Sequence, residues 1–538
     1  MQDYAPIVFE HHQSVLNAGV LFAIPALISQ GLNAFFKVFK PLPAGFYGLH
    51  HIVLMLCFMA LCRIKNPEQL KRHSPGELGK LLGLDRIPEV GYFRKKLKQI
   101  TDQYKLDDLH TELFHSWVEE MPEMFFYIDG HVMVYHGEQA NLPKRFVSRE
   151  KLCLSGTTEF WVNDLKGRPL MVVTAELNEK LKTAIEEIIP KIMKETTTIT
   201  KLPSEPIFTI VFDREAYEPV WFKQLWNDYR VAVITYRKNV KDNWDEKLFQ
   251  STEVQLNNTN VTMQLCEMGV RLNELWFREI RKLSDSGHQT SIMTTHPSLS
   301  MQNTASKMFS RWTQENFFKY MIKEFDFDRM IEYGTEEINQ KRTIPNPEYK
   351  TLTYQIKKSR EKKSRLEARV FQKLENDDKT VIDNFAQILI ESSPLIEKIN
   401  EYNNEIKKLI ANRKKQTARI SIAQMPKEQR YNKLKTESKK LKNAVIMVAY
   451  RAETALYNIM SELYTSNQQE GRVILNEIFT SDADIIPDYE NKKLTVRLHS
   501  LSTPRANIAV KELCTLLTLT ESRYPTTDLT MVYETLAV

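Results

Sequence analysis

The spacing of apolar residues in the first part of the chain predicts buried helices. Two apolar stretches, 14–36 and 52–62, are separated by a proline-containing segment at 41–45. Polar residues interrupt the first stretch, and the second is shorter than the roughly 20 residues that cross a bilayer. We expect a helical region over residues 1–110 that does not enter a membrane, with insertion into a membrane as the alternative.

A short helix, a turn and a basic helix are predicted within residues 74–103. Ser74 and Pro75 are typical of a helix start, and Gly83 of a helix end. Arg94 and Lys95 lie on the second helix, which makes them candidate DNA-binding residues. This outline is typical of a helix-turn-helix, and an ordinary helix pair with a solvated basic face is the alternative.

Alternating and fully apolar runs replace the helical spacing from residue 124. The predicted elements are a strand bent at Asp129, a hairpin, a helix, a strand, a helix and a strand: 125–135, 160–174, 176–195, 207–212, 218–229 and 231–236. The first three strands favour an antiparallel meander, and the later two favour parallel additions to the same sheet. A mixed α/β sheet in this order is the ribonuclease-H-like arrangement, although other mixed folds share it.

An interruption of this pattern predicts a β-rich insertion at 241–300, which alternates like strands. Helical spacing then returns over 300–325. We therefore expect one core built from residues 120–240 and 301–340, with the insertion between the two parts.

The C-terminal half combines long helices with concentrated positive charge. Helices are predicted at 348–376, 380–416 and 427–465, within a basic region spanning 346–470. Segments 351–375 and 405–442 carry net charges of +5 and +10, although the whole chain carries only +6. A face of one sign favours phosphate and nucleic-acid binding, with a solvated helix surface as the alternative.

The last predicted region, 471–538, is a small α/β region with strand-like runs at 473–475 and 494–498. No function is assigned to it from the sequence.

Composition limits the class of protein. A chain of 538 residues exceeds one core, and 42% hydrophobic with 26% charged residues excludes wholesale disorder. Five scattered cysteines without a CxxC pair argue against a zinc ribbon or a disulfide scaffold. Because the first residues also lack the basic segment of a signal peptide, we expect a cytoplasmic protein with reduced thiols.

Two aspartates stand at comparable positions in the predicted sheet. Asp129 lies at the bend of the first strand and Asp213 directly follows the fourth. If those strands are neighbours, the carboxylates lie side by side and repel each other unless a cation separates them. Two carboxylates and a substrate phosphate suit Mg²⁺. Each Asp alone is also a common turn former or helix cap.

Glu315 is the candidate third acid. Arg311, Glu315, Lys319 and Lys323 recur every fourth residue and therefore share one face of a predicted helix. One acid within a stripe of cations is consistent with a metal ligand flanked by phosphate-binding groups. A surface helix with ion pairs is the alternative.

These residues lie in three blocks: Tyr127-Ile-Asp129-Gly-His131, Val211-Phe-Asp213-Arg-Glu-Ala-Tyr217 and Arg311-Trp-Thr-Gln-Glu315-Asn316. The blocks resemble the signatures of DDE transposases from bacterial insertion sequences, in the subgroup with a β-rich insertion before the Glu. The likeness extends over about residues 45–335 and includes Leu84-Asp-Arg-Ile-Pro-Glu-Val90 and Gly287-His-Gln-Thr-Ser291. In that subgroup a Tyr precedes the Arg and a Lys follows the Glu. Here Met308 replaces the Tyr, and Lys319 or Lys323 takes the place of the displaced Lys.

The resemblance implies metal-dependent cleavage at transposon ends and transfer of the freed 3′-OH into target DNA. Asp129, Asp213 and Glu315 would be the catalytic acids and would hold two Mg²⁺ or Mn²⁺ ions. Arg311 and Lys319 would contact phosphates of double-stranded DNA. A homodimer in a synaptic complex, in the bacterial cytoplasm at the nucleoid, is implied. The alternatives are a transposase-derived DNA-binding protein without strand transfer and a ribonuclease-H-like nuclease.

Trp276 and Phe277 lie on a predicted strand of the insertion and point to opposite faces of it. One of the two rings could support a base extruded from the duplex near the cleavage site. Packing within the insertion is the alternative, and Trp276 is the candidate DNA-binding residue of the pair.

Overall fold

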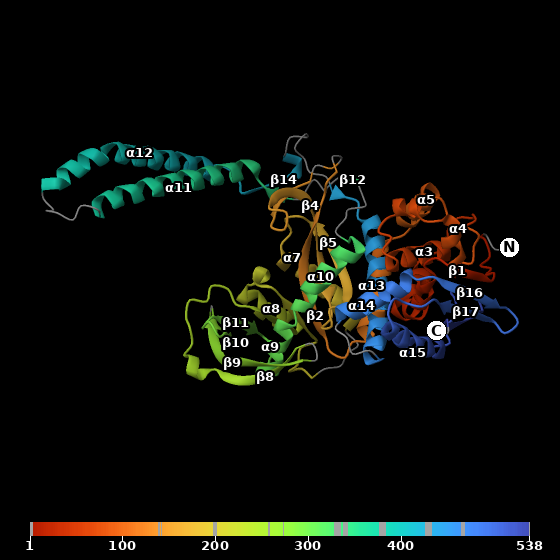
Figure 1. Cartoon of the computed structure of the whole chain (residues 1–538). Helices are drawn as coiled ribbons and strands as arrows, with labels where there is room; N and C mark the ends of the chain where they lie inside the picture. Colours follow the sequence, from red (N-terminus) through yellow and green to blue (C-terminus); the bar gives the residue numbers. More distant parts are fainter. Residues whose placement is uncertain are drawn as a thin grey trace. The chain divides into compact units, whose positions relative to one another are not determined.

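The computed structural model describes residues 4–137, 140, 142–196, 202–256, 259–272, 274–327, 335–336, 343–375, 383–424, 433–463 and 468–536. Its contacts divide the chain into two compact units. Unit 1 comprises residues 1–136, 143–333 and 435–538, and unit 2 comprises residues 137–142 and 334–434. Figure 1 shows the elements of both units along the chain.

A ten-stranded mixed sheet lies at the centre of unit 1. Its strands are β2 (Phe125–Val134), β3 (Lys144–Val147), β4 (Leu152–Asn163), β5 (Pro169–Glu176), β6 (Phe208–Phe212), β7 (Val231–Tyr236), β8 (Gln250–Leu256), β9 (Thr259–Leu272), β10 (Leu275–Leu283) and β11 (Gln289–Thr294). Their order is β3-β4-β2-β6-β7-β11-β10-β9-β8, and β5 pairs with β4.

The pairing follows the predicted meander and crossovers. Strands β2, β4 and β5 are antiparallel neighbours, whereas β6 and β7 join β2 in parallel. β2 is one continuous strand through Asp129, as the sequence predicted, but β3 was not predicted. Within the insertion, β8 and β9 pair antiparallel.

The β-rich insertion continues the central sheet. β11 pairs antiparallel with β7, with Ile292 opposite Tyr236, and β10, β9 and β8 follow in turn. The insertion is β-rich, as expected, and it extends the central sheet. Without the insertion, β7 would be an edge strand of the sheet. β11 pairs with the backbone groups that β7 would otherwise expose.

Helices cover the sheet on both faces because side chains alternate along each strand. Phe126 and Ile128 of β2 enter the larger apolar cluster, which also contains residues of α6 (Leu106–Glu119), α7 (Leu181–Thr196) and α8 (Pro219–Tyr229). Phe125 and Tyr127 enter a second cluster with α9 (Met301–Phe309). Asp129 follows the alternation of Phe125 and Tyr127 and so belongs to the α9 face.

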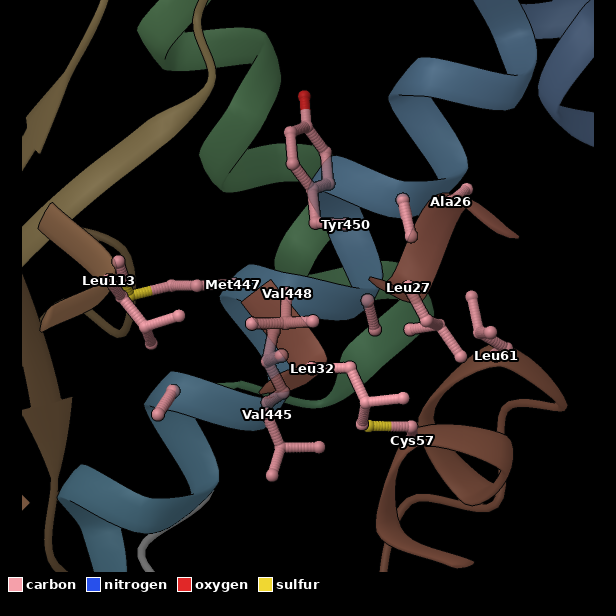
Figure 2. Close-up of a cluster of buried hydrophobic side chains, with 14 of the residues drawn as sticks. Ala26, Leu27, Leu32, Cys57, Leu61, Leu113, Val445, Met447, Val448 and Tyr450 are labelled. Atoms are coloured by element: carbon pink, nitrogen blue, oxygen red, sulfur yellow. The ribbon is translucent and has the colours of Figure 1, made fainter. Parts of the chain in front are cut away.

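The N-terminal region is helical and packs around α13 (Glu437–Leu463). Its elements are η1 (Ala18–Ala23), α1 (Ile24–Leu27), η2 (Ile28–Leu32), α2 (Asn33–Val38), α3 (Leu49–Leu61), η3 (Pro67–Arg72), α4 (Pro75–Lys80) and α5 (Val90–Gln103). Figure 2 shows Val445, Met447 and Val448 of α13 among side chains of these helices. The basic helix α5 follows α4, as predicted for residues 74–103.

The helical run Ala18–Val38 is long and apolar enough to cross a membrane, and 67% of its most apolar window is buried inside unit 1. It is also broken at Gly31, whose φ of 114° lies outside helical geometry. Such burial is the behaviour of a core helix. The expectation that the chain does not enter a membrane stays a prediction.

The C-terminal segment shares a second sheet with the N-terminus. The order of this sheet is β1 (His12–Val15), β16 (Ala483–Asp488), β17 (Lys493–Leu498) and β18 (Thr530–Thr535), with α14 (Gln468–Thr480) and α15 (Pro504–Leu519) beside it. Residues 471–538 were expected to form a region of their own, but in the structure their strands share a sheet with β1. The strand suggested at 473–475 was wrong: it belongs to α14, where Ile474, Leu475, Ile478 and Phe479 form a buried helical face.

Unit 2 contains the antiparallel helices α11 (Pro347–Glu375) and α12 (Asp383–Lys414) and two short strand pairs. The strands are β12 (Thr335–Glu336) with β15 (Lys433–Leu434) and β13 (Thr343–Pro345) with β14 (Arg419–Ser421), and η6 (Ile422–Gln424) follows β14. The region expected at 346–470 is therefore divided, because α13 belongs to unit 1. The buried apolar side chains of α13 lie on the core of unit 1, whereas α11 is mostly polar.

A buried charge network ties α13 to three other segments of unit 1. Glu453 of α13 accepts hydrogen bonds from Arg63 and Arg472, each at 2.9 Å, and from the Tyr320 hydroxyl. Burial raises the pKa of Glu453, but the two guanidinium groups outweigh it and hold that pKa below its ordinary value. The network joins α13 to the end of α3, to α14 and to α10 (Trp312–Phe325).

We expect Glu453→Gln to lower the free energy of unfolding by roughly 3–5 kcal/mol, because it leaves the buried guanidinium group of Arg472 without its counter-charge. Glu534→Gln is the control, since Glu534 pairs with Arg497 at the surface at 3.2 Å and should contribute within about 1 kcal/mol. Urea unfolding followed by circular dichroism measures both. Equal midpoints for the two variants would contradict this role of Glu453.

Candidate functional site

The register between β2 and β6 places Asp129 beside Asp213. Ile128 lies opposite Phe212 in this parallel pair, so the next residue on each chain is an aspartate. Both side chains accept a hydrogen bond from the backbone N–H that follows them, at 2.9 Å for Gly130 and 2.7 Å for Arg214. The predicted pairing of the two acids is thus present in the structure.

Arg311 links Glu315 to Asp129, because its guanidinium group contacts both carboxylates. The guanidinium group of Arg311 lies 3.3 Å from an oxygen of Asp129 and 3.0 Å from an oxygen of Glu315. Arg311 is the N-cap of α10 and its side chain is mostly buried. The structure therefore brings together the three acids and the arginine that the sequence selected.

Gln314 fixes the start of α10 on the sheet. Its buried side-chain amide donates to the carbonyl oxygens of Tyr127 on β2, at 3.2 Å, and of Trp161 on β4, at 3.3 Å. The Tyr127 hydroxyl in turn donates to the carbonyl of Lys307 in α9, at 2.8 Å. Gln314 was missed by sequence reasoning, because its partners are backbone carbonyls that leave no side-chain pattern.

The pKa of Asp129 responds to its burial and to the charges around it. Burial raises the pKa of Asp129 to about 6, Arg311 opposes that rise, and Asp213 and Glu315 add to it. Tyr236, at the end of β7, also belongs to this group: burial raises its pKa, and Asp213 and Glu315 act in the same direction. The sequence offered no signal for Tyr236 beyond its place at a strand end.

Carboxylate oxygens suit a hard divalent cation, and a positive charge between Asp129 and its acidic neighbours would relieve their repulsion. In the structure, that charge is supplied by Arg311. Among the described residues, no three His, Cys, Asp or Glu side chains lie close enough to share one ion. The Nε of Arg311 is buried and has no hydrogen-bond partner there, so the guanidinium is only partly satisfied in this position.

The other candidate DNA-binding cations are mostly at the surface. Lys319 lies one turn beyond Glu315, and Lys323 is 78% exposed and pairs with Glu324 at 3.0 Å. On α5, Lys95 is exposed and Arg94 pairs with Glu68 at 2.9 Å. Their roles in DNA binding stay predictions.

Part of the basic segment at 405–442 serves the fold instead. Lys439 is buried and donates to the carbonyl of Phe327 at 2.7 Å, and Lys442 donates to the carbonyl of Asp326 at 2.7 Å. Lys440 pairs with Asp107 and Glu437. These three lysines are therefore not a solvated face available to DNA, which corrects the expectation for this end of the segment.

The hairpin of β3 and β4 carries arginines and lies next to β2, the strand that contains Asp129. β3 and β4 pair with Val147 opposite Leu152, and the hairpin places Arg145 within 3.7 Å of Glu215. Arg149 contacts the imidazole of His131 at 3.1 Å. Glu215 and His131 each lie two residues beyond an acid of the site. Sequence reasoning did not select this hairpin, whose first strand was not predicted.

The structure separates the two rings of the insertion. Trp276 is 71% exposed on β10, whereas Phe277 is 5% exposed and belongs to the larger apolar cluster. Phe277 thus packs, and Trp276 is the ring of the pair that remains accessible.

Fold and site together define a mixed α/β protein with three acids and an arginine at one edge of its sheet. The family described as "Transposase protein" matches residues 2–537. The chain therefore belongs to this transposase family, whose class of function is DNA transposition.

Among solved structures, the chain is similar to the cryo-EM structure of a piggyBac transposase synaptic complex with hairpin DNA. The two share 8% sequence identity over 86% of this chain and 85% of that chain, with a TM-score of 0.31. At that level the likeness says nothing about the site. No match was found among curated proteins.

We expect Asp129→Asn to stabilise the metal-free protein at pH 8 but not at pH 4. The folded pKa of about 6 lies above the ordinary value near 3.8. Ionisation of Asp129 therefore costs stability as the pH rises from about 4 through about 6. The gain should be about 1–2 kcal/mol, because the side chain keeps 26% exposure and part of its hydration.

Urea unfolding in the presence of a chelator, at both pH values, measures this difference. A stability difference between Asp129→Asn and wild type that stays constant from pH 4 to pH 8 would contradict the raised pKa.

Proposed function

We propose that this protein is a metal-dependent DDE transposase of a bacterial insertion sequence, with Asp129, Asp213 and Glu315 as its catalytic acids. The observation that carries the proposal is the in-register pair of aspartates on β2 and β6, joined to Glu315 through Arg311. The family supplies the class of function, and this geometry supports the proposed acids.

The order of the sheet supports a ribonuclease-H-like core. Strands β5, β4, β2, β6 and β7 lie side by side, with an antiparallel meander followed by two parallel additions. This is the order predicted from the sequence. It places the ends of the central strands, and so the two aspartates, at one edge of the sheet.

Two Mg²⁺ or Mn²⁺ ions held by the three carboxylates would activate a water and stabilise the leaving oxygen of a phosphodiester. Basic side chains would hold the DNA strand in place. Arg311 would exchange its carboxylate partners for a phosphate next to the scissile bond, and Lys319 or Lys323 would bind a neighbouring phosphate. No covalent bond to the protein is needed.

The substrates would be the double-stranded ends of a transposon and the target DNA. A homodimer would bring two ends together in a synaptic complex, and it would act in the cytoplasm at the nucleoid. Arg94 and Lys95 on α5 would contact the backbone of the duplex away from the cleaved bond. Trp276 would lie against an extruded base.

We expect Asp129→Asn, Asp213→Asn and Glu315→Gln each to reduce end cleavage by a factor of roughly 1,000 or more, because each removes charge from a site worth several kcal/mol. Binding of DNA should change little, since cations supply most of its free energy. The substrate is a duplex with the terminal sequences that flank the gene of this chain, assayed with and without Mg²⁺.

Asp528→Asn is the matched control, because Asp528 pairs with Lys492 at the surface. Cleavage by Asp213→Asn at the rate of the control would exclude the proposed site. DNA binding by wild type without cleavage would favour a transposase-derived binding protein. Cleavage that never joins the 3′-OH to a target would favour a nuclease.

The two rings of the insertion give a separate test. We expect Phe277→Ala to destabilise the fold by about 3–5 kcal/mol through loss of packing. Trp276→Ala should leave stability within about 0.5 kcal/mol and weaken binding of the end duplex. Unfolding and fluorescence-anisotropy titrations measure the two effects. Unchanged DNA affinity of Trp276→Ala would assign its ring no role in binding.

A further inference from the structure

Trp312 is an exposed aromatic ring at the candidate site that has no role in the core. It is the first residue of α10 and is 59% exposed. By contrast, Trp117 and Trp161 of the same unit are fully buried. Exposing this much ring surface to water gains the fold little, since apolar burial is its main stabilising term.

The ring shares a helix face with Glu315 and Lys319. These three residues are spaced i, i+3 and i+7, which places them on one side of α10. The ammonium of Lys319 lies 6.0 Å from the centre of the Trp312 ring. Phe317 and Met321 on the other side of the helix are buried. α10 therefore has one face for the core and one face that presents a ring, a cation and an acid together.

Arg311 connects the face of α10 that carries Trp312 to the acids. It immediately precedes Trp312 and contacts both Asp129 and Glu315. Along the axis of α10, Trp312 and Glu315 are separated by less than one helical turn, roughly 5 Å.

A nucleotide matches this combination of groups. Its base offers a flat π surface for the indole, and its phosphate offers an anion for the ammonium. A paired base inside a duplex has both faces covered by its neighbours, so a ring stacks best on a base outside the pairing. A peptide carries no comparable repeat of flat rings and anions.

We propose that Trp312 stacks on an unpaired nucleobase of the DNA strand whose phosphodiester enters the acidic site, while Lys319 binds a phosphate of that strand. The inference rests on the proposed function. It assigns a nucleobase as the ligand of Trp312, which lies within one of the three sequence blocks but was not among the candidate residues chosen from them. It predicts a preference for DNA with a single-stranded end.

The probe is a short duplex with a single-stranded 3′ tail that carries one 2-aminopurine, compared with the same duplex made blunt. With EDTA present to prevent cleavage, binding by wild type should change the fluorescence of the tail base. Trp312→Ala should abolish this change and weaken binding of the tailed duplex roughly tenfold, because stacking is worth about 1–3 kcal/mol per base. Its affinity for the blunt duplex should equal that of wild type.

Trp312→Phe and Trp312→Leu separate the ring from its bulk. Phe keeps a stacking surface and should retain most of the signal, whereas Leu should behave like Ala. Tyr229→Ala is the control, because Tyr229 is another exposed aromatic residue, on α8. Unfolding curves confirm that each variant is folded.

Three outcomes would overturn the inference: an unchanged fluorescence signal with Trp312→Ala, full retention of the signal by Trp312→Leu, or equal loss of affinity for tailed and blunt duplexes. If wild type cleaves end DNA with Mg²⁺ in any of these cases, the proposed function stands and the stacking site fails. If wild type neither binds nor cleaves DNA, both fail. Loss of self-association in Trp312→Ala without loss of tail binding would assign the ring to a protein contact instead.

Discussion

The burial of Glu453 in α13 is the constraint on which unit 1 depends. A carboxylate without water needs counter-charges and donors, and here they come from Arg63 after α3, Arg472 of α14 and Tyr320 of α10. α13 therefore reaches its buried position only when the N-terminal helices, α14 and α10 surround it. The apolar contacts in Figure 2 supply most of the stabilisation, and the charge network selects the arrangement.

The candidate site depends on that arrangement through α10. Tyr320 attaches the middle of the helix to Glu453, and Gln314 attaches its first turn to β2 and β4. β4 is attached to α13 as well, since Asn443 donates to the buried Glu159 at 2.8 Å. Three carboxylates repel one another, so a rigid support is needed to hold them together, and Arg311 lowers the repulsion in the absence of metal. Strain of this kind is expected where function requires charge to be concentrated.

The two faces of α10 explain how a transposase could couple its core to DNA. Phe317 and Met321 pack inward, while Trp312, Glu315 and Lys319 face outward. A change in the packing of α13 would move both faces together. The basic hairpin of β3 and β4 lies beside the same edge of the sheet, so cations border the acids along the strands as well as along the helix.

Local patterns in the sequence predicted the central strands of the sheet and the candidate acids of the site. Alternating and fully apolar runs predicted β2, β6 and β7, and their order made Asp129 and Asp213 neighbours because parallel strands bring equivalent ends together. Helical spacing placed Arg311 and Glu315 on one face. Only the tertiary structure decided which surfaces meet. It assigned α13 to unit 1, joined the insertion to β7, engaged Lys439 and Lys442 with backbone carbonyls, and attached Gln314 to the sheet. The physical reason is that periodicity shows which face of an element avoids water, whereas the partner of that face depends on long-range packing that no local pattern records.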